Sequence, residues 1–231
     1  MNIAVMCAAV ALASAANADT VIRANADWLP FAVTPGVKVG SALDFSKVCG
    51  VDAPAGKHGR VVIRDGHFEF ERRPGVPQRF YGVNLCFTAN FVDYPDAKAF
   101  ADRLAHLGYN AIRIHHYERT LTEGAEDGTA INPKRMRQLD GLLAACTEAG
   151  LYVTTDLFVS RRVPWRTLGQ DRDGEVPMDE FKALVRTNEA AYANLATFTR
   201  ALLGHVNAYT GRRWADEPAL AFLSLVNENN I

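Results

Sequence analysis

The sequence predicts an α/β fold of the (β/α)8 TIM-barrel type, in an incomplete form that comprises strands one to four of the barrel and a β-hairpin before them. Three observations support this prediction. From residue 79 onward, short apolar runs alternate with segments of helical periodicity, which is typical of parallel strands joined by right-handed crossovers. The first of these strands lacks the glycine-rich phosphate loop of the alternative architecture, an open doubly wound sheet. Every predicted strand ends in polar side chains, as strands do at the mouth of a barrel.

The first predicted element is a hairpin made of residues 60–64 and 67–71. The dipeptide between them, Asp65-Gly66, favours a two-residue turn with positive φ. Residues 19–58, which precede the hairpin, are rich in Gly, Pro and Ala and indicate an irregular lead-in. A hairpin in this position can close the bottom of a barrel.

The alternating elements follow in order along the rest of the chain. A helix at residues 95–107 begins with a proline in its first turn and ends before a glycine. Asn132 and Pro133 are typical of the start of a second helix, which Gly150 ends. The predicted strands are residues 79–84, 110–114, 151–156 and 219–226, and residues 178–207 are predicted to form one long helix or two.

Composition and charge narrow the class of protein. The formal net charge is −1 with both signs interspersed, so we expect neither a nucleic-acid partner nor an anionic membrane. The hydrophobic fraction of 48% is enough for a substantial core. Signal cleavage would remove Cys7 and leave Cys49, Cys86 and Cys146, an odd number without metal-type spacing, so we expect no metal ion and at most one disulfide bond. We also expect no cofactor.

The N-terminus has the pattern of a secretory signal peptide spanning residues 1–18. An apolar run at residues 3–13 is followed by Ala16-Asn17-Ala18, a small-x-small site that predicts cleavage after Ala18. The run is shorter than the roughly 20 residues that span a bilayer. The sequence therefore predicts a secreted or periplasmic protein with no membrane association after cleavage.

Side chains that can bind or react stand at the end of each predicted strand. A carboxyl group at the mouth of a barrel can act as a general acid or base, and an amide there can exchange hydrogen bonds with a hydroxyl-rich ligand. In strand order, these candidate residues are Asn84, then Arg113, His115 and His116, then Asp156, and finally Asn227 and Glu228.

Four segments, RFYGVNL, GYNAIRIHH, LYVTTDLF and LAFLSLVNEN, resemble strands one to four of a cellulase-type glycoside hydrolase of family 5 and its relatives in clan A. The resemblance covers roughly residues 60–231. It implies a (β/α)8 barrel that hydrolyses β-glycosidic bonds with retention, with a nucleophilic Glu after strand seven. It also implies that Glu228 is the acid/base, that Asn227 binds a sugar hydroxyl, and that Arg113 keeps the nucleophile ionised. Many members carry Asp-x-His after strand three, where this chain has Asp156 followed by Leu and Phe.

Each candidate also has a simpler structural interpretation. Glu228 could be an ordinary surface carboxylate. Arg113 alternates with two isoleucines and should face away from the helices, where an ion pair with Asp156 is the alternative to a direct role. His115 and His116 fit a sugar contact and an ordinary polar strand end equally well. Asp156 itself is interpreted as structural.

Aromatic side chains are interpreted in two ways. Trp165 lies in a polar loop where a core position is less available, so we predict that it stacks on a sugar ring. Four other aromatic residues near strand ends could also stack on a sugar ring, but aromatic side chains at such positions more often pack, and we interpret them as packing residues: Phe87, Phe91, Tyr94 and Tyr117.

Three functional classes follow. The first is a secreted retaining glycoside hydrolase acting on a carbohydrate, monomeric at full length, of which residues 59–231 are the N-terminal half of the barrel. A complete barrel takes roughly 250 residues, so we expect the chain to lack the nucleophile half and to be inactive alone. The second is a non-catalytic carbohydrate-binding barrel protein. The third is another barrel hydrolase or lyase that uses Glu228 for proton transfer.

Overall fold

A computed structural model describes residues 23–29 and 36–229. The chain divides into two compact units, residues 1–34 and 35–231. The predicted signal peptide, residues 1–18, lies outside the described residues. No helix in the described part of the chain is both long and apolar enough to cross a membrane.

The described part of the first unit is a single turn, in which the Asn25 side chain accepts hydrogen bonds from the backbone N–H groups of Asp27 and Trp28. In the second unit, residues 36–58 form turns and bends. Among the described residues, regular secondary structure begins at Val61. The lead-in is therefore irregular wherever the structure describes it.

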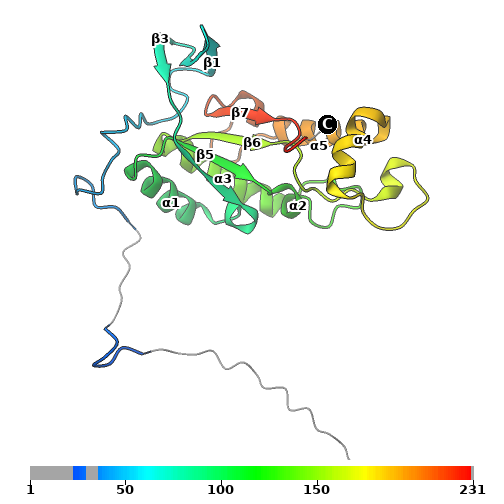
Figure 1. Ribbon diagram of the computed structural model, residues 1–231, viewed down its shortest axis with the longest axis horizontal. Coiled ribbons are helices and arrows are strands. Elements are labelled where there is room, and N and C mark those ends of the chain that lie inside the picture. Colours follow the sequence, from blue (N-terminus) through cyan, green and yellow to red (C-terminus); the bar gives the residue numbers. More distant parts are fainter. Residues whose placement is uncertain (1–22, 30–35, 230–231) are drawn as a thin grey trace, which may run out of the picture. The chain divides into compact units, whose positions relative to one another are not determined.

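Three short strands, β1 (Val61–Arg64), β2 (His67–Phe70) and β3 (Arg73–Gln78), form an antiparallel sheet (Figure 1). β1 and β2 are the predicted hairpin, and Asp65 and Gly66 between them have φ angles of 48° and 78°. The sequence does not predict β3, because it contains two prolines, which cannot donate to a ladder. β3 tolerates them since it lies at the edge of the sheet.

The second sheet is parallel, and its strands lie side by side in chain order (Figure 1). These strands are β4 (Gly82–Cys86), β5 (Ala111–His115), β6 (Tyr152–Asp156) and β7 (Leu220–Ser224). The α-helices between them are α1 (Tyr94–His106), α2 (Glu118–Leu121), α3 (Pro133–Ala149), α4 (Met178–Thr187) and α5 (Glu189–Gly204), and the short 3-10 helices are η1 (Phe87–Asn90), η2 (Trp165–Leu168) and η3 (Trp214–Asp216). Each crossover moves the chain one strand along, as in four consecutive strands of a (β/α)8 barrel. The fold is therefore an incomplete barrel of this type.

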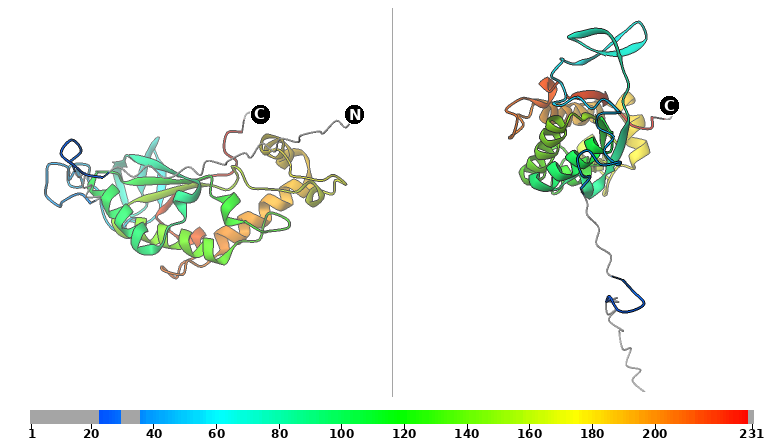
Figure 2. Two further views of the ribbon diagram at one scale, coloured as in Figure 1. Left: turned by 90° about the horizontal axis from the view of Figure 1, so that it is seen from below. Right: turned by 90° about the vertical axis from the view of Figure 1, so that its left-hand side faces the viewer.

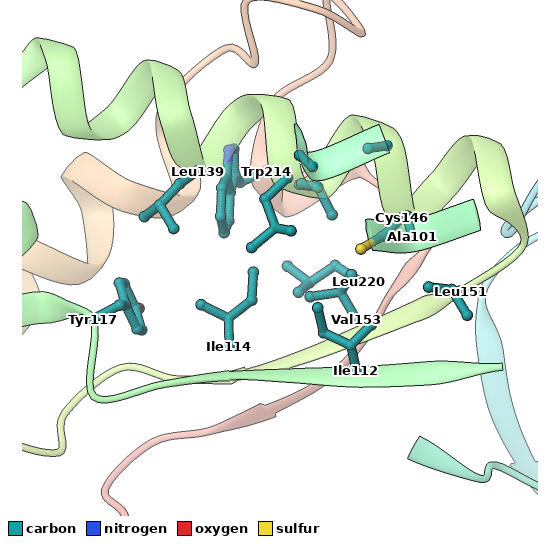
Figure 3. Close-up of a cluster of buried hydrophobic side chains, with 14 of the residues drawn as sticks. Ala101, Ile112, Ile114, Tyr117, Leu139, Cys146, Leu151, Val153, Trp214 and Leu220 are labelled. Carbon is teal, nitrogen blue, oxygen red and sulfur yellow. The ribbon is translucent and has the colours of Figure 1, made fainter. Parts of the chain in front are cut away.

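The main core lies between the parallel sheet and the helices that cover one of its faces (Figures 2 and 3). Ile112 and Ile114 of β5 point toward α3 and belong to the same buried cluster as Leu139 of that helix and Trp214. Each buried aliphatic side chain of this size stabilises the fold by about 1.5–3 kcal/mol. Because strand side chains alternate, Arg113 points to the opposite face, which is the interior of the barrel.

Local signals locate the helices. The structure starts the first barrel strand later than predicted and decides between the two alternatives predicted for residues 178–207. β4 begins at Gly82 rather than at residue 79, because a Cβ atom at Gly82 would lie 2.7 Å from the carbonyl oxygen of Ala111 and the close pairing with β5 starts there. The segment 178–207 contains two helices, which break at Asn188. The side chain of Asn188 accepts a hydrogen bond from Ala191 N at 2.9 Å and so caps α5.

The hairpin packs against the interior face of the parallel sheet, toward its N-terminal end. The rings of Phe70 and Tyr152 stack with their centroids 5.0 Å apart, and Phe68 meets Phe222 at 4.9 Å. Phe80, just before β4, contacts both Tyr152 and Phe222. Aromatic side chains thus fill this part of the interior, and polar side chains are left at the C-terminal end.

Candidate active site

Positive φ angles at non-glycine residues gather beyond the C-terminal ends of the parallel strands. Among the described residues, four non-glycine residues have positive φ, and one of them is in the hairpin turn. The other three lie just beyond β4, β5 and β7: Phe87 (φ 55°), His116 (φ 50°) and Glu228 (φ 50°). Such conformations cost roughly 1–3 kcal/mol each and cluster at functional sites. The mouth of the sheet is therefore the first place to look for chemistry.

Asp156, the last residue of β6, is the centre of a charged network. Its side chain is 1% exposed. It accepts hydrogen bonds from Arg113 Nη2 at 2.7 Å and Nε at 3.2 Å, and it pairs with His115 Nδ1 at 2.7 Å. The Tyr117 hydroxyl donates to its backbone carbonyl at 2.7 Å. One carboxylate thus orients two cationic or ionisable side chains from the neighbouring strand.

Asn227 joins this network from the segment that follows β7. It is buried, its Oδ1 accepts a hydrogen bond from Arg113 Nη2 at 2.7 Å, and its backbone N–H donates to the carbonyl of Phe158 at 3.0 Å. Its Nδ2 is buried and has no partner among the described residues. Glu228, the following residue, is exposed at the mouth. The arrangement presents a fixed amide donor and a carboxylate side by side.

The two histidines after β5 have different surroundings. His115 is buried, and its Nδ1 is occupied by Asp156, so it serves to position that network. His116 stacks on the ring of Phe87, and its Nδ1 lies 3.1 Å from Ser160 Oγ. Burial lowers the pKa of His116, and the neighbouring His115 lowers it further. Of the pair, His116 is the one available to a ligand.

Two predicted binding residues lie elsewhere than expected. Trp165 is buried in a second hydrophobic cluster with Phe158 and Phe181, and Arg172 covers its ring at 4.4 Å. The prediction that Trp165 forms a sugar platform is therefore wrong. Asn84 is exposed on the interior face, but β4 continues to Cys86, so Asn84 does not end the strand.

A buried pair of charged residues, which the sequence did not single out, supports the mouth. Glu118 Oε1 accepts hydrogen bonds from the backbone N–H groups of Val159 and Ser160, and burial raises the pKa of Glu118. Arg161 donates to Asn194 Oδ1 at 2.7 Å, and burial lowers its pKa to about 10. These contacts fix the segment that places Ser160 beside His116. The only sequence signal is that Glu118 closely follows a strand end.

Phe87, which the sequence analysis interprets as a packing residue, is not packed in this chain. Its side chain is 60% exposed, whereas Phe91 and Tyr117 are buried as predicted. Its position directly after a barrel strand is the signal that could have found it.

Among the described residues, no group of three His, Cys, Asp or Glu side chains could hold a metal ion.

Comparisons with known proteins show the family and the fold. The model of the cellulase family, glycosyl hydrolase family 5, matches residues 72–198. The endo-1,4-β-mannanase of Rhizomucor miehei has a similar structure, with a TM-score of 0.56 and 16% identity over 74% of this chain and 48% of the mannanase. The family 5 mannosidase of the same organism matches with a TM-score of 0.56 and 17% identity over 75% of this chain and 49% of the mannosidase. The chain thus spans about half the length of these solved structures, and no curated protein matches it.

Proposed function

The chain belongs to glycosyl hydrolase family 5, the cellulase family, and on that premise we propose that it takes part in the hydrolysis of β-linked glycans with retention, with Glu228 as the general acid/base. The observation that carries the proposal is the position of Glu228. It is exposed at the C-terminal ends of the parallel strands, directly after Asn227, whose side chain is fixed by Arg113. A carboxyl group there can protonate a departing sugar oxygen and then deprotonate the attacking water.

Two neighbours of Glu228 have supporting roles in this proposal. The unpartnered Nδ2 of Asn227 donates to a sugar hydroxyl next to the scissile bond, which would satisfy a buried donor that otherwise costs stability. Arg113 binds Asp156 and Asn227 through Nε and Nη2, and its Nη1 has no hydrogen-bond partner in the described part of the chain. That nitrogen is available to keep a nucleophilic carboxylate ionised.

The nucleophile must come from a different part of the barrel. In retaining enzymes the two carboxyl groups stand about 5 to 5.5 Å apart. Asp156 does not suit this role, because it is buried and bound to both Arg113 and His115. We propose that the nucleophile lies on a later strand of the complete barrel, outside this chain, and that the chain alone has no hydrolase activity.

The substrate is proposed to be a neutral β-linked polysaccharide or oligosaccharide. The similar solved structures are named as a β-mannanase and a mannosidase, so β-mannan is the first substrate to test, followed by cellulose and xylan. Export is also part of the proposal, because residues 1–18 have the signal-peptide pattern.

The first experiment assays the chain alone and the complete enzyme on these polysaccharides. The chain alone should show no turnover, and robust turnover would contradict the proposal that a later strand supplies the nucleophile. Binding without turnover by the complete enzyme would favour the non-catalytic carbohydrate-binding alternative.

The second experiment replaces Glu228 with Gln in the complete enzyme. Turnover of polysaccharide should fall by about 100- to 10,000-fold, because its leaving group needs a proton. An activated aryl glycoside should still form the glycosyl-enzyme and give a burst, and azide should restore turnover because it attacks without a base.

The matched control is Glu180→Gln, which changes an exposed carboxylate of α4 and should leave activity unchanged. Near-normal activity of Glu228→Gln on polysaccharide would rule out Glu228 as the acid/base. Loss of the burst in a folded variant would do the same.

A further inference from the structure

Glu118 is a fully buried carboxylate beside the mouth of the sheet. It begins α2, directly after Tyr117, and is 0% exposed. Its Oε1 accepts hydrogen bonds from the backbone N–H groups of Val159 and Ser160, the latter at 3.3 Å, and its Oε2 has no partner among the described residues. One buried charge is therefore directed at two consecutive amides of the segment that follows β6.

The position of Glu118 costs stability at neutral pH. Burial raises the pKa of its carboxyl group, and its hydrogen bonds and the nearby charge of Arg161 offset only part of this effect. Because the folded protein holds the proton of Glu118 more tightly than the unfolded chain does, stability falls as the pH rises through the pKa of Glu118. A carboxylate that served the fold alone would not carry this cost, so it points to a functional role.

Ser160 is held from both sides. Glu118 binds its backbone amide on one side. On the other side Arg161, which is 3% exposed, donates from Nη1 to the carbonyl of Gly128 and to Asn194 Oδ1, each at 2.7 Å. These groups all lie between β5 and the end of α5 and are already buried, so the packing of further segments cannot expose them. The backbone at Ser160 is therefore fixed by contacts within the described chain.

The side chain of Ser160 continues this set of contacts to the mouth of the sheet. Its Oγ lies 3.1 Å from Nδ1 of His116, whose backbone is in the left-handed region with φ of 50°. Four titratable or charged groups influence the His116 ring: His115, Glu228, Asp156 and Arg113. Because Glu228 is one of them, the place and charge of this ring act on the proposed acid/base.

We propose that Glu118 and Ser160 are positioning residues that hold the imidazole of His116 beside the proposed acid/base. The ionised carboxylate of Glu118 fixes the Ser160 backbone, and the Ser160 hydroxyl fixes the ring. A charged acceptor binds an N–H group about twice as strongly as a neutral one. Protonation of Glu118 therefore loosens the segment, and the change reaches His116 through Ser160. This inference rests on the proposed function and deepens it.

The first experiment is an NMR titration of the full chain between about pH 4 and pH 8. It follows the backbone amides of Val159 and Ser160 and the ring nitrogens of His116. Protonation of Glu118 should move both amide signals with one midpoint, above the ordinary value of 4.5. His116 should show a step with the same midpoint in addition to its own titration.

The other titratable groups close to Glu118 keep their charge in this pH range. Burial raises the pKa of Tyr117, and the pKa of Arg161 is about 10. A step that the two amides share with His116 therefore reports Glu118 and not one of these neighbours.

Two variants and a control divide the contacts into their parts. Glu118→Gln removes the charge and keeps an acceptor oxygen, so the shared step should vanish and the amides of Val159 and Ser160 should exchange about 3- to 10-fold faster. Ser160→Ala should keep the step at the two amides and remove it from His116. The matched control is Glu123→Gln, an exposed carboxylate of the same segment after β5, and it should leave every midpoint unchanged.

Stability and kinetics separate positioning from support of the fold. At neutral pH, Glu118→Gln should unfold at the same or a higher urea concentration than the parent, because the costly charge is gone. In the complete enzyme the same variant should lower kcat on polysaccharide by about 3- to 10-fold. KM should stay within about twofold, since the His116 ring acts at the proton of Glu228.

The outcomes separate this inference from the proposed function. If the amides show no shared step, the role of Glu118 is refuted, and if His116 does not follow them, or still follows them in Ser160→Ala, the link through Ser160 is refuted. An unchanged kcat of Glu118→Gln, or a lower urea midpoint, would assign Glu118 to the fold alone. In all these cases the role of Glu228 stands. If the complete parent enzyme hydrolyses no β-linked glycan, the proposed function fails instead, and the titration still decides whether the contacts exist.

Discussion

Replacing Asp156 with Asn should destabilise the fold by about 2–4 kcal/mol. The substitution keeps the size of the side chain but removes its charge and one of its two acceptor oxygens. The single oxygen of Asn can accept from Arg113 while its NH2 group faces His115, which must then change tautomer, or it can accept from His115 while its NH2 group faces the Arg113 donors. Removing one member of a buried ion pair costs about 3–5 kcal/mol. Because the Arg113 side chain is 33% exposed, water replaces part of the contacts that it loses. The loss of stability should therefore lie somewhat below the range for a fully buried pair.

The assay is urea unfolding of the chain at neutral pH, followed by circular dichroism and analysed with a common slope for parent and variant. Asp171→Asn is the control, because Asp171 is an exposed acid in the loop after β6, and it should change stability by no more than about 0.5 kcal/mol. A double variant with Arg113→Met should show a coupling of at least about 1 kcal/mol. A loss below about 1 kcal/mol for Asp156→Asn, or independent effects of the two substitutions, would refute the network.

Two further predictions concern pH and export. Burial and the neighbouring His115 lower the pKa of His116 in the folded protein below its ordinary value of 6.5. As the pH falls below this value, the unfolded state takes up the proton before the folded state does, so the folded state loses stability on the acid side. His116→Gln should flatten the dependence of the urea midpoint on pH below about 6.5, and an unchanged slope would contradict the assignment. N-terminal sequencing of the exported protein should find Asp19 first, and exported protein that begins at Met1 would contradict the predicted cleavage.

The elements that the sequence predicts well carry their signals locally. Asn132 caps α3 by accepting hydrogen bonds from Lys134 N and Arg135 N, and Gly150 ends that helix with φ of 88°. The Asp65-Gly66 turn is equally local. The first strand of the barrel is less well located, because its start depends on the close approach of a second strand that no local pattern shows.

The same distinction between local signals and contacts of distant segments holds for the predicted site residues. Strand ends place Arg113, Asn227 and Glu228 at one edge, as the alternation of strands and helices predicts. The partners of Asp156 are fixed only when β5 and β6 pair, so its central position could not be predicted from its own neighbours. Trp165 has polar neighbours in the sequence, but cluster partners such as Phe181 come from distant segments and bury it.

The packing of the hairpin has a consequence for the order in which the molecule is assembled. β1 and β2 leave the ribosome first, but the surfaces that cover Phe68 and Phe70 come from Tyr152 and Phe222, which are synthesised much later. Contacts of such high sequence separation form slowly. Until they form, a growing chain carries exposed aromatic side chains on a short strand pair, the kind of surface that chaperones recognise. Delayed closure of this end would keep the chain unfolded for longer, which is what the proposed export would require.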